Sequence, residues 1–485
     1  MDEPTPTDEF EVVITGGTVV DGTGGPRFRA DVAVVGDRIR GVGDFTGRPA
    51  ARRVDARDLV VAPGFIDAHT HDDRLVLSAP EMTPKVSQGV TTVVAGNCGV
   101  SLAPLVNCDP PPPLNLLGGR EWYRFSSMED YLQAVESDPP AVNLAMLVGH
   151  STLRAGVMTD LNRPASPSER ARMGERLDES LDAGAIGMST GLAYPPAASA
   201  PTDEIVALAQ VLSRRHALYT THMRDEGDGV VDSVREAIEI GRRAGVAVVI
   251  SHHKCSGRRN WGLSRQTLAL IAAARRSQTV DLDVYPYTAS SSVLMGEWIE
   301  KAERVLITWS DTHPDQAGRD LIEIARDWRV SQSEAAARLQ PAGAIYFQMD
   351  EDDLRRIMSF ADTMIGSDGL PHDACPHPRL WGTFPRVLGH YQRELGLLTL
   401  EEAVRRMTSV PARVFGLSDR GTVRAGAIAD LVIFDPRRVI DTATFSDPQR
   451  SATGIERVIV NGADVWADRK GTGSRPGRVL RRSST

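Results

Sequence analysis

Histidine, cysteine and aspartate residues stand directly after short apolar runs in this sequence, and these are common ligands of divalent metal ions. The first case is His69 and His71, which follow the apolar run 59–62 within the loop 63–73. Residues two apart on an extended backbone project to the same side, so the two imidazoles can share one metal ion. A pair of histidines that only hydrogen-bond is the alternative, and the ligand-type residues that end later runs favour the metal interpretation.

The later apolar runs end in the same kinds of side chain. The complete candidate metal site is His69, His71, Cys98, His222, His252 and Asp368. Zinc accepts this mixture of thiolate, imidazole and carboxylate ligands. The alternative role for Cys98 is a small buried hydrophobic side chain, and for His222 it is a hydrogen-bonded core histidine. Adjacent strand residues face opposite sides, so we expect His252 to face the site and His253 to face away from it. His150 also ends a run, and a supporting hydrogen bond is its expected role.

Asp368 lies within the sequence 366–369, at the end of the last apolar run. A carboxylate at this position can bind a metal ion, accept a proton from water and return that proton to a leaving group. Capping of the following helix is the alternative. We therefore predict that Asp368 is the catalytic general base and acid.

Eight apolar runs alternate with helical patterns through the middle of the chain. The runs end at or near residues 71, 98, 150, 189, 222, 252, 285 and 368. Helical patterns at 166–183, 203–216 and 229–244 lie between them. This alternation predicts an α/β fold with a (β/α)8 TIM barrel, in which active-site residues sit at the carboxyl ends of the strands.

The rest of the chain divides around this barrel. Short strand-like runs fill residues 1–60 and return at 416–485, and we expect both ends to build one small β-sandwich domain. The catalytic barrel is expected to occupy 61–415. Residues 288–360 interrupt it with about 70 residues where a handful is usual, so this insertion is expected to be a lid over the substrate.

Composition limits the possible partners. A net charge of −9, with 41% hydrophobic and 25% charged residues, is typical of a globular protein and gives no reason to expect nucleic acid or an anionic membrane as partner. The acidic, proline-rich start lacks signal-peptide features, and no apolar stretch reaches about 18 residues, so a cytoplasmic protein is expected. Four cysteines without CxxC spacing suggest free thiols or a metal ligand. The oligomeric state stays open.

Several longer phrases resemble the amidohydrolase superfamily, and the finer ones are similar to the N-acyl-D-amino-acid deacylase (D-aminoacylase) family. The phrases are PGFIDAHTHDD (63–73), AGNCGVSLAP (95–104), GHSTLR (149–154), GAIGMSTGLAYPP (184–196), THMRDEG (221–227), SHHK (251–254), DVYPYTASSS (283–292), IGSDG (365–369), HPRLWGTFPRVLG (377–389) and GTVRAGAIADLVIFDP (421–436). The HxH and GSDG phrases mark only the superfamily, whereas GNCG with THMRDEG and HPRxxGTFPRVLG is more specific. The resemblance covers nearly the whole chain.

The resemblance implies a metal-dependent barrel with a small β-domain and a division of labour among the candidate ligands. Cys98, His222 and His252 would hold a tightly bound zinc ion. A second, weaker site would use His69 and His71, and Asp368 would be the general base and acid. Many relatives bridge two metals with a carboxylated lysine on strand four. Residues 185–189 of this chain contain no lysine, which argues against the hydantoinase and dihydroorotase branches.

The resemblance also implies how the substrate is held. The free carboxylate of an N-acyl amino acid would be bound by Lys254, Tyr285, Ser291 and Arg379, and cations with hydroxyls suit that task. Lys254 and Arg379 could instead be ordinary surface charges.

The side-chain pocket would include Tyr346 and Met349, which suggests an apolar D-residue such as Met, Leu or Phe. No arginine lies between residues 290 and 298 to pair with an acidic side chain. We therefore predict zinc-dependent hydrolysis of N-acyl-D-amino acids, with the D preference resting on the resemblance alone. Another amidohydrolase activity remains open, namely a cyclic amidase, a dipeptidase, a deaminase or an N-acyl-D-Glu or D-Asp deacylase. A non-catalytic metal-binding barrel is a remote alternative.

Overall fold

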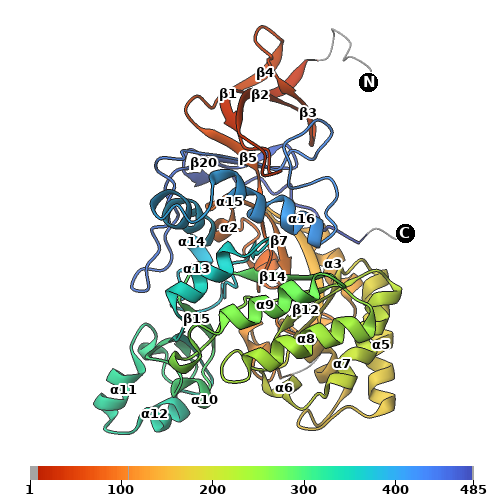
Figure 1. Ribbon diagram of the computed structural model, residues 1–485, viewed down its shortest axis with the longest axis vertical. Helices are drawn as coiled ribbons and strands as arrows, with labels where there is room; N and C mark the ends of the chain where they lie inside the picture. The colour runs from red at the N-terminus through yellow and green to blue at the C-terminus, as the bar shows by residue number, and fades with distance from the viewer. Residues whose placement is uncertain (1–8, 107–108, 483–485) are drawn as a thin grey trace.

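The computed structural model describes residues 9–106 and 109–482, and eight parallel strands form a barrel (Figure 1). In order around the barrel they are β6 (Phe65–Asp67), β7 (Val90–Ala95), β10 (Asn143–Gly149), β11 (Gly187–Gly191), β12 (Leu218–His222), β13 (Val248–Ile250), β14 (Val280–Val284) and β18 (Met364–Ile365). The first and last strands meet, because the Ala68 amide donates to the Ile365 carbonyl at 3.3 Å and Thr70 pairs with Gly369. The predicted (β/α)8 barrel and its eight strands are confirmed.

Helices cover the outside of the barrel. The longer ones are α3 (Met128–Ser137), α4 (His150–Val157), α5 (Pro167–Asp182), α7 (Thr202–Arg214), α8 (Val230–Ala244), α9 (Ser264–Ala274), α13 (Glu351–Ser359), α14 (Arg379–Arg386) and α15 (Leu400–Met407). Their ends follow local sequence rules. Ser166 and Glu169 form a capping box at the start of α5, and Gly245 ends α8 in the left-handed conformation with φ 65°. The shorter helices are α1 (Leu75–Ser78), α2 (Thr83–Val86), α6 (Pro195–Ala198) and α16 (Ser409–Val414).

Strands from both ends of the described chain form one nine-stranded sheet. It contains β1 (Phe10–Val19), β2 (Phe28–Val35), β3 (Arg38–Gly43), β4 (Ala50–Asp55), β5 (Val60–Pro63), β19 (Leu431–Phe434), β20 (Ile455–Val460), β21 (Ala463–Ala467) and β22 (Lys470–Gly471). The long strand β1 pairs with β4 near its start and with β5 near its end, and its register with β2 shifts between Ile14 and Gly17. Strand β19 joins the two chain ends by pairing antiparallel to β5. This pairing supports the proposal that both ends contribute to one β-domain.

The insertion between strands β14 and β18 has its own sheet and core. Its antiparallel strands are β15 (Ala289–Val293), β16 (Arg304–Ser310) and β17 (Ala342–Phe347), and its helices are α10 (Gly296–Ile299), α11 (Leu321–Trp328) and α12 (Gln332–Leu339). Helices α11 and α12 lie away from the barrel at the lower left of Figure 1. Helix α13 packs against α9, so it belongs to the helix layer of the barrel. The separately folded part of the insertion therefore ends before residue 360, the predicted limit.

The C-terminal segment returns to the barrel after the last strand of the β-domain. The Leu480 amide donates to the Leu144 carbonyl at 2.7 Å, and the Arg482 amide donates to the Gly184 carbonyl at 3.0 Å. Residues near the C-terminus thus cover the barrel beside β10 rather than extending the β-domain. Within residues 9–106 and 109–482, no helix combines the length and apolar character needed to cross a bilayer.

Candidate functional site

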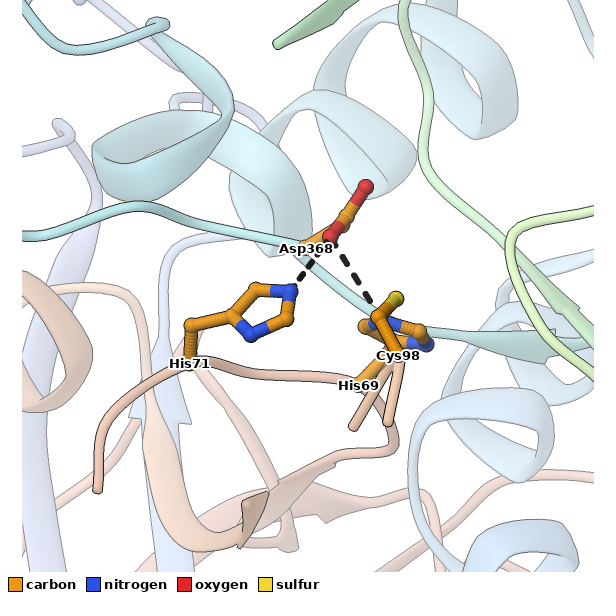
Figure 2. Close-up of side chains that lie close together, drawn as sticks. All are labelled: His69, His71, Cys98 and Asp368. Atoms are coloured by element: carbon orange, nitrogen blue, oxygen red, sulfur yellow. Dashed lines mark hydrogen bonds and ion pairs between the residues drawn. The ribbon is translucent and has the colours of Figure 1, made fainter. Parts of the chain in front are cut away.

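Four predicted ligands meet where the first and last barrel strands come together (Figure 2). His69 and His71 follow β6, Cys98 follows β7, and Asp368 follows β18. The His69 Nε2 atom lies 3.2 Å from the Cys98 sulfur, and His71 Nε2 lies 3.2 Å from Asp368 Oδ1. His69 Nε2 is 3.5 Å from the same carboxylate oxygen. The potential ligand atoms of all four residues lie within 4.8 Å of one another.

A second group adjoins the first and shares its cysteine. Cys98, His222 and His252 also have ligand atoms within 4.8 Å of one another. The Cys98 sulfur lies 3.3 Å from His252 Nε2, and the ring centroids of His222 and His252 are 4.5 Å apart. All three side chains are buried. The structure therefore brings together all six predicted ligands, as two adjoining groups.

The side chains of the second group fit a zinc ion. Among the described residues, neither ring nitrogen of buried His222 has a hydrogen-bond partner. Buried polar groups are nearly always paired, so an imidazole with two free nitrogens indicates a ligand that supplies the missing bond. A thiolate with two imidazoles is a donor set that zinc favours.

The backbone of the site is strained. Cys98, His252 and Asp368 have φ angles of 53°, 35° and 49°, in the left-handed region that non-glycine residues rarely occupy. Such conformations persist where the surrounding structure enforces them, and they concentrate at functional sites. The strain falls on three predicted site residues that follow three different barrel strands.

The pKa shifts describe a site with anions among imidazoles. Burial alone would raise the pKa of Cys98, but His69 and His252 outweigh this effect and hold that pKa well below its usual value. Burial acts in the same way on Asp368, where Arg379 and the neighbouring histidines hold the pKa well below its ordinary value. Both shifts favour the negatively charged form of the group, and negative charge favours a bound cation.

A cavity of about 370 Å³ opens onto the ligand groups. The lining includes the site residues His71, Cys98, His222, His252 and Asp368. It also includes four apolar or aromatic side chains, Leu116, Tyr194, Trp298 and Leu370. The size and the mixed polarity are those of a small-molecule site.

Two of the predicted carboxylate-binding residues line this cavity. The Ser291 hydroxyl is buried and lacks a hydrogen-bond partner in the described part of the chain. The Lys254 ammonium lines the cavity too, and it lies 2.7 Å from Glu226 Oε1. A free hydroxyl and an ammonium beside the metal ligands can bind an anionic group.

Arg379 and Tyr285 lie behind Asp368 instead of forming the cavity wall. Arg379 is fully buried, with Nη1 3.0 Å from Asp368 Oδ2 and its guanidinium 4.5 Å from the Tyr285 ring centroid. Arg379 Nη2 also donates to the Ser291 carbonyl at 3.1 Å. The direct partner of this guanidinium is thus the predicted catalytic carboxylate.

The two residues predicted for the side-chain pocket lie outside the cavity. The Tyr346 hydroxyl donates to the Val293 carbonyl at 2.9 Å and accepts from the Met295 amide at 2.8 Å, so it is used inside the lid. Met349 lines a separate space of only about 10 Å³ and lies beside the Tyr285 hydroxyl. Sequence position alone could not show that the lid strand β17, which contains Tyr346, and the segment after it, which contains Met349, place these side chains outside the cavity.

Three acidic residues near the ligands, two of them buried and Glu226 half-buried, were not identified from sequence. Glu226, in the loop after β12, lies 3.0 Å from His252 Nδ1. Asp283 in β14 lies 3.5 Å from His69 Nδ1 and accepts the His252 amide at 2.8 Å. Asp67 accepts the amide of Ser367 at 2.7 Å, just before Asp368. The feature of the sequence that could have identified them is an acidic residue at or near the end of a predicted strand.

His150 and His253 have structural partners away from the ligand groups. His150 Nε2 lies 3.1 Å from Glu204 Oε1, and the ring of His253 contacts the Thr267 hydroxyl at 2.8 Å, on helix α9. The expectation that His252 rather than His253 faces the site agrees with this arrangement. His150 supports helix α7, which carries Glu204, rather than a metal ligand.

A search of protein-family models matches residues 52–465 to the model described as Amidohydrolase family. Three relatives from Alcaligenes xylosoxydans xylosoxydans are similar over almost the whole chain. A D-aminoacylase is 54% identical, and the alignment covers 98% of both chains. An N-acyl-D-aspartate deacylase is 51% identical, with 97% of this chain and 95% of the relative covered. An N-acyl-D-glutamate deacylase is 49% identical, with 99% of this chain and 98% of the relative covered.

The similar solved structures include the same kinds of deacylase. A D-aminoacylase crystal structure matches with a TM-score of 0.96 and 55% identity, covering 98% of this chain and 100% of that one. An N-acyl-D-glutamate deacylase from Bordetella bronchiseptica, in complex with zinc and a phosphonate inhibitor that mimics the tetrahedral intermediate, matches with a TM-score of 0.95 and 48% identity at the same coverage. A third structure, from a study of the binuclear metal center in D-aminoacylase, matches with a TM-score of 0.96 and 55% identity. It covers 98% of this chain and 100% of that one.

Proposed function

We propose, because the chain belongs to the amidohydrolase family, that it hydrolyses the amide bond of N-acyl-D-amino acids with the help of zinc. The products are a D-amino acid and a carboxylate. The observation that carries this proposal is the convergence of a Cys–His–His group and a carboxylate on one cavity. The relatives named above act on N-acyl-D-amino acids with different side chains, which supports the substrate class.

The zinc ligands proposed for this chain are Cys98, His222 and His252, and His69 with His71 would form the second, weaker site. When bound, zinc polarises the scissile carbonyl and lowers the pKa of water toward about 7. The unpaired imidazole of His222 and the lowered pKa of Cys98 support the first assignment. The binuclear center of the D-aminoacylase structure supports a second site.

Asp368 is the proposed proton carrier of the reaction. Its low pKa keeps the carboxylate ionised, so it can accept the proton of the attacking water. It then returns this proton to the nitrogen of the leaving amine as the amide bond breaks. Arg379, 3.0 Å from Oδ2, orients the carboxylate and leaves Oδ1 directed toward the two histidines of the loop after β6.

Lys254 and Ser291 are proposed to bind the free carboxylate of the substrate, because both line the cavity. Arg379 and Tyr285 lie outside the cavity lining and would support this subsite through their contacts with its residues. Arg379 contacts the Ser291 carbonyl, and its guanidinium stacks over Tyr285. A substrate with an esterified carboxylate should therefore bind poorly.

The proposed substrates carry apolar side chains. Leu116, Tyr194, Trp298 and Leu370 would form the pocket, in place of Tyr346 and Met349. Leu116, Tyr194 and Leu370 belong to one buried apolar cluster with Cys98, and Trp298 packs against this cluster. An apolar side chain placed there loses contact with water, whereas a carboxylate would lose its hydration without a charged partner among these four residues.

An N-acyl-D-Glu or D-Asp deacylase is the second candidate, and the cationic residues of the cavity favour it. Arg224 and Lys301 both line the cavity. Arg224 is paired with Glu236 at 2.9 Å and with the carbonyls of Ala198 and Ala200 at 3.0 Å, so its charge is already compensated. Lys301 is the cation that an acidic substrate side chain would use.

The test compares hydrolysis of N-acetyl-D-methionine, N-acetyl-D-glutamate, N-acetyl-D-aspartate and N-acetyl-L-methionine, with the zinc content measured on the same sample. Preferred turnover of N-acetyl-D-methionine with near-stoichiometric zinc is the expected result. Preferred turnover of either acidic substrate would replace the apolar assignment with the second candidate. Turnover of the L-form alone, or of none of the four with zinc present, would refute the proposal. A cytoplasmic location stays a prediction from the sequence.

A further inference from the structure

Glu226 connects the proposed metal site to the proposed substrate site. It lies in the loop between β12 and α8 and lines the cavity with a side chain that is 12% exposed. Its Oε1 atom lies 2.7 Å from Lys254 Nζ and 3.0 Å from His252 Nδ1, and Oε2 lies 3.7 Å from His222 Nε2. One carboxylate thus contacts a residue of each proposed site.

These contacts form a triangle in which two groups compete for His252. Lys254 Nζ is also 2.7 Å from His252 Nδ1. An ammonium can only donate, so this contact is a hydrogen bond only when Nδ1 carries no proton. A carboxylate can only accept, so Glu226 bonds to Nδ1 only when that nitrogen carries the proton. The two neighbours therefore favour opposite tautomers of the neutral ring.

The tautomer decides whether His252 can bind metal. The Nε2 atom is the one that faces the Cys98 sulfur, at 3.3 Å. A proton on Nδ1 leaves the Nε2 lone pair free for a metal ion, whereas a proton on Nε2 blocks it. Histidine ligands usually donate their other ring nitrogen to a carboxylate or carbonyl for this reason.

We propose that Glu226 is a positioning residue that fixes the metal-binding tautomer of His252 against the competing Lys254 ammonium. Glu226 accepts from both His252 Nδ1 and Lys254, which leaves two Lys254 protons for the substrate carboxylate. Without Glu226, Lys254 donates to His252 Nδ1 and stabilises the tautomer that cannot bind metal. This inference rests on the proposed role of His252 as a zinc ligand.

The loop geometry supports a positioning role. Asp225 accepts the amides of Gly227 and Gly229 at 2.6 and 3.0 Å, which fixes the loop around Glu226. The Ser256 amide donates to the Glu226 carbonyl at 2.7 Å and ties this loop to the one after β13. The backbone that carries the Glu226 carboxylate is thus fixed within its own loop after β12 and tied to the loop after β13.

The test is a double-mutant cycle on zinc affinity, measured by competition with a chromophoric chelator. Glu226→Ala should weaken zinc binding by about 10- to 100-fold, the usual effect of losing a partner of a metal-bound histidine. Lys254→Met should change it by less than about threefold. The double variant Glu226→Ala/Lys254→Met should recover most of the lost affinity, because the competing donor is gone. Non-additivity of this kind reports a direct coupling of the two side chains through His252.

Two further variants separate the loss of the Glu226 charge from the loss of its volume and from a general disturbance of the loop. Glu226→Gln keeps the volume and one acceptor, so its loss of affinity should be smaller than that of Glu226→Ala. Asp228→Asn changes a carboxylate two residues further along the same loop, where it contacts Arg259 and Asn260. It should leave zinc affinity and KM unchanged, whereas Glu226→Gln should also raise KM through the loss of a fixed Lys254.

The outcomes separate the two proposals. Equal weakening of zinc binding by Glu226→Ala with and without Lys254, or no weakening at all, overturns the role of Glu226. Unchanged zinc affinity in His252→Ala would instead overturn the proposed ligand set and the inference with it. Recovery in the double variant, together with zinc loss in His252→Ala, supports both.

Discussion

Replacing Lys85 by Met should destabilise the protein strongly and in a pH-dependent manner. Lys85 is fully buried, and its Nζ atom lies 2.8 Å from Asp67, 3.2 Å from Asp72 and 2.9 Å from the Ser367 hydroxyl. Because Asp67 is the last residue of β6 and Ser367 follows β18, this cluster joins the first and last strands of the barrel. Removing the ammonium leaves two buried carboxylates without their cation.

The size of the stability loss can be calculated from the protonation of one carboxyl, which removes the uncompensated charge at the lowest cost in free energy. At pH 7 an aspartate with an unfolded pKa of about 3.9 lies about 3 units above that pKa, so neutralising it costs about 4 kcal/mol. Burial already raises the pKa of Asp72, against the opposing effect of Lys85, so Asp72 should take up the proton. The expected loss of about 4 kcal/mol agrees with that usual for breaking one buried ion pair.

The sign of the pH dependence is fixed by the same reasoning. Between pH 5 and 7 the folded variant binds one proton more than the unfolded chain, so its stability falls as the pH rises. At pH 5 the cost of neutralising the carboxyl is only about 1.5 kcal/mol. Relative to the unsubstituted protein, the Lys85→Met penalty should shrink by about 3 kcal/mol between pH 7 and pH 5.

The assay is urea unfolding followed by tryptophan fluorescence at both pH values. Lys470→Met, at an exposed position of β22, makes the same chemical change on the surface and should alter stability by less than about 0.5 kcal/mol. Adding Asp72→Asn to Lys85→Met should restore part of the loss at pH 7. A penalty equal at pH 5 and pH 7, or no larger than that of Lys470→Met, would refute the reasoning.

Three further predictions concern catalysis and acid stability. Asp368→Asn should lower kcat by about 10²- to 10⁴-fold while zinc stays bound, and retained turnover in a sample with measured zinc would contradict its role. Ser291→Ala should raise KM about tenfold, the equivalent of about 1.4 kcal/mol, and initial rates across substrate concentration would show it. Burial would raise the pKa of Glu204, but His150 and Arg154 lower it to about 2, so this group supplies about 3 kcal/mol above its unfolded pKa of about 4.3. That contribution should be lost as the pH falls toward about 2. Urea titrations at pH 7 and pH 3 should therefore show that Glu204→Gln loses less stability on acidification than the unsubstituted protein does. An equal loss in the two proteins would contradict the role assigned to Glu204.

The barrel could be predicted because its signals are local. Each strand is a short apolar run, and helices such as α5 and α8 begin or end at residues whose capping chemistry is visible in the sequence. The positions of the ligands follow from the fold itself, since the carboxyl ends of parallel strands meet at one face of a barrel. His222 could therefore be placed at the site from its position at a strand end, without information about its neighbours in space.

The supporting contacts could not be predicted in the same way. Glu226 and Lys85 are polar residues in loops or short helices, where a solvated surface role is the ordinary expectation. Their importance comes from distances to residues far away in the chain, such as the 2.9 Å contact between Lys85 and Ser367. Tyr346 failed as a pocket residue for a related reason, because pairing within the lid sheet sets the direction in which its side chain points.

The sequence by itself determined the fold class, the identity of the candidate ligands and the candidate catalytic carboxylate, because periodicity and strand-end position are properties of the chain alone. Only the tertiary structure decided which side chains line the cavity, that Arg379 pairs with Asp368, and that Glu226 contacts both His252 and Lys254. Those relations depend on how separate segments approach one another to within hydrogen-bonding distance. A one-dimensional pattern specifies which residues are present at a strand end, but the packing of the lid and loops specifies what each of them touches.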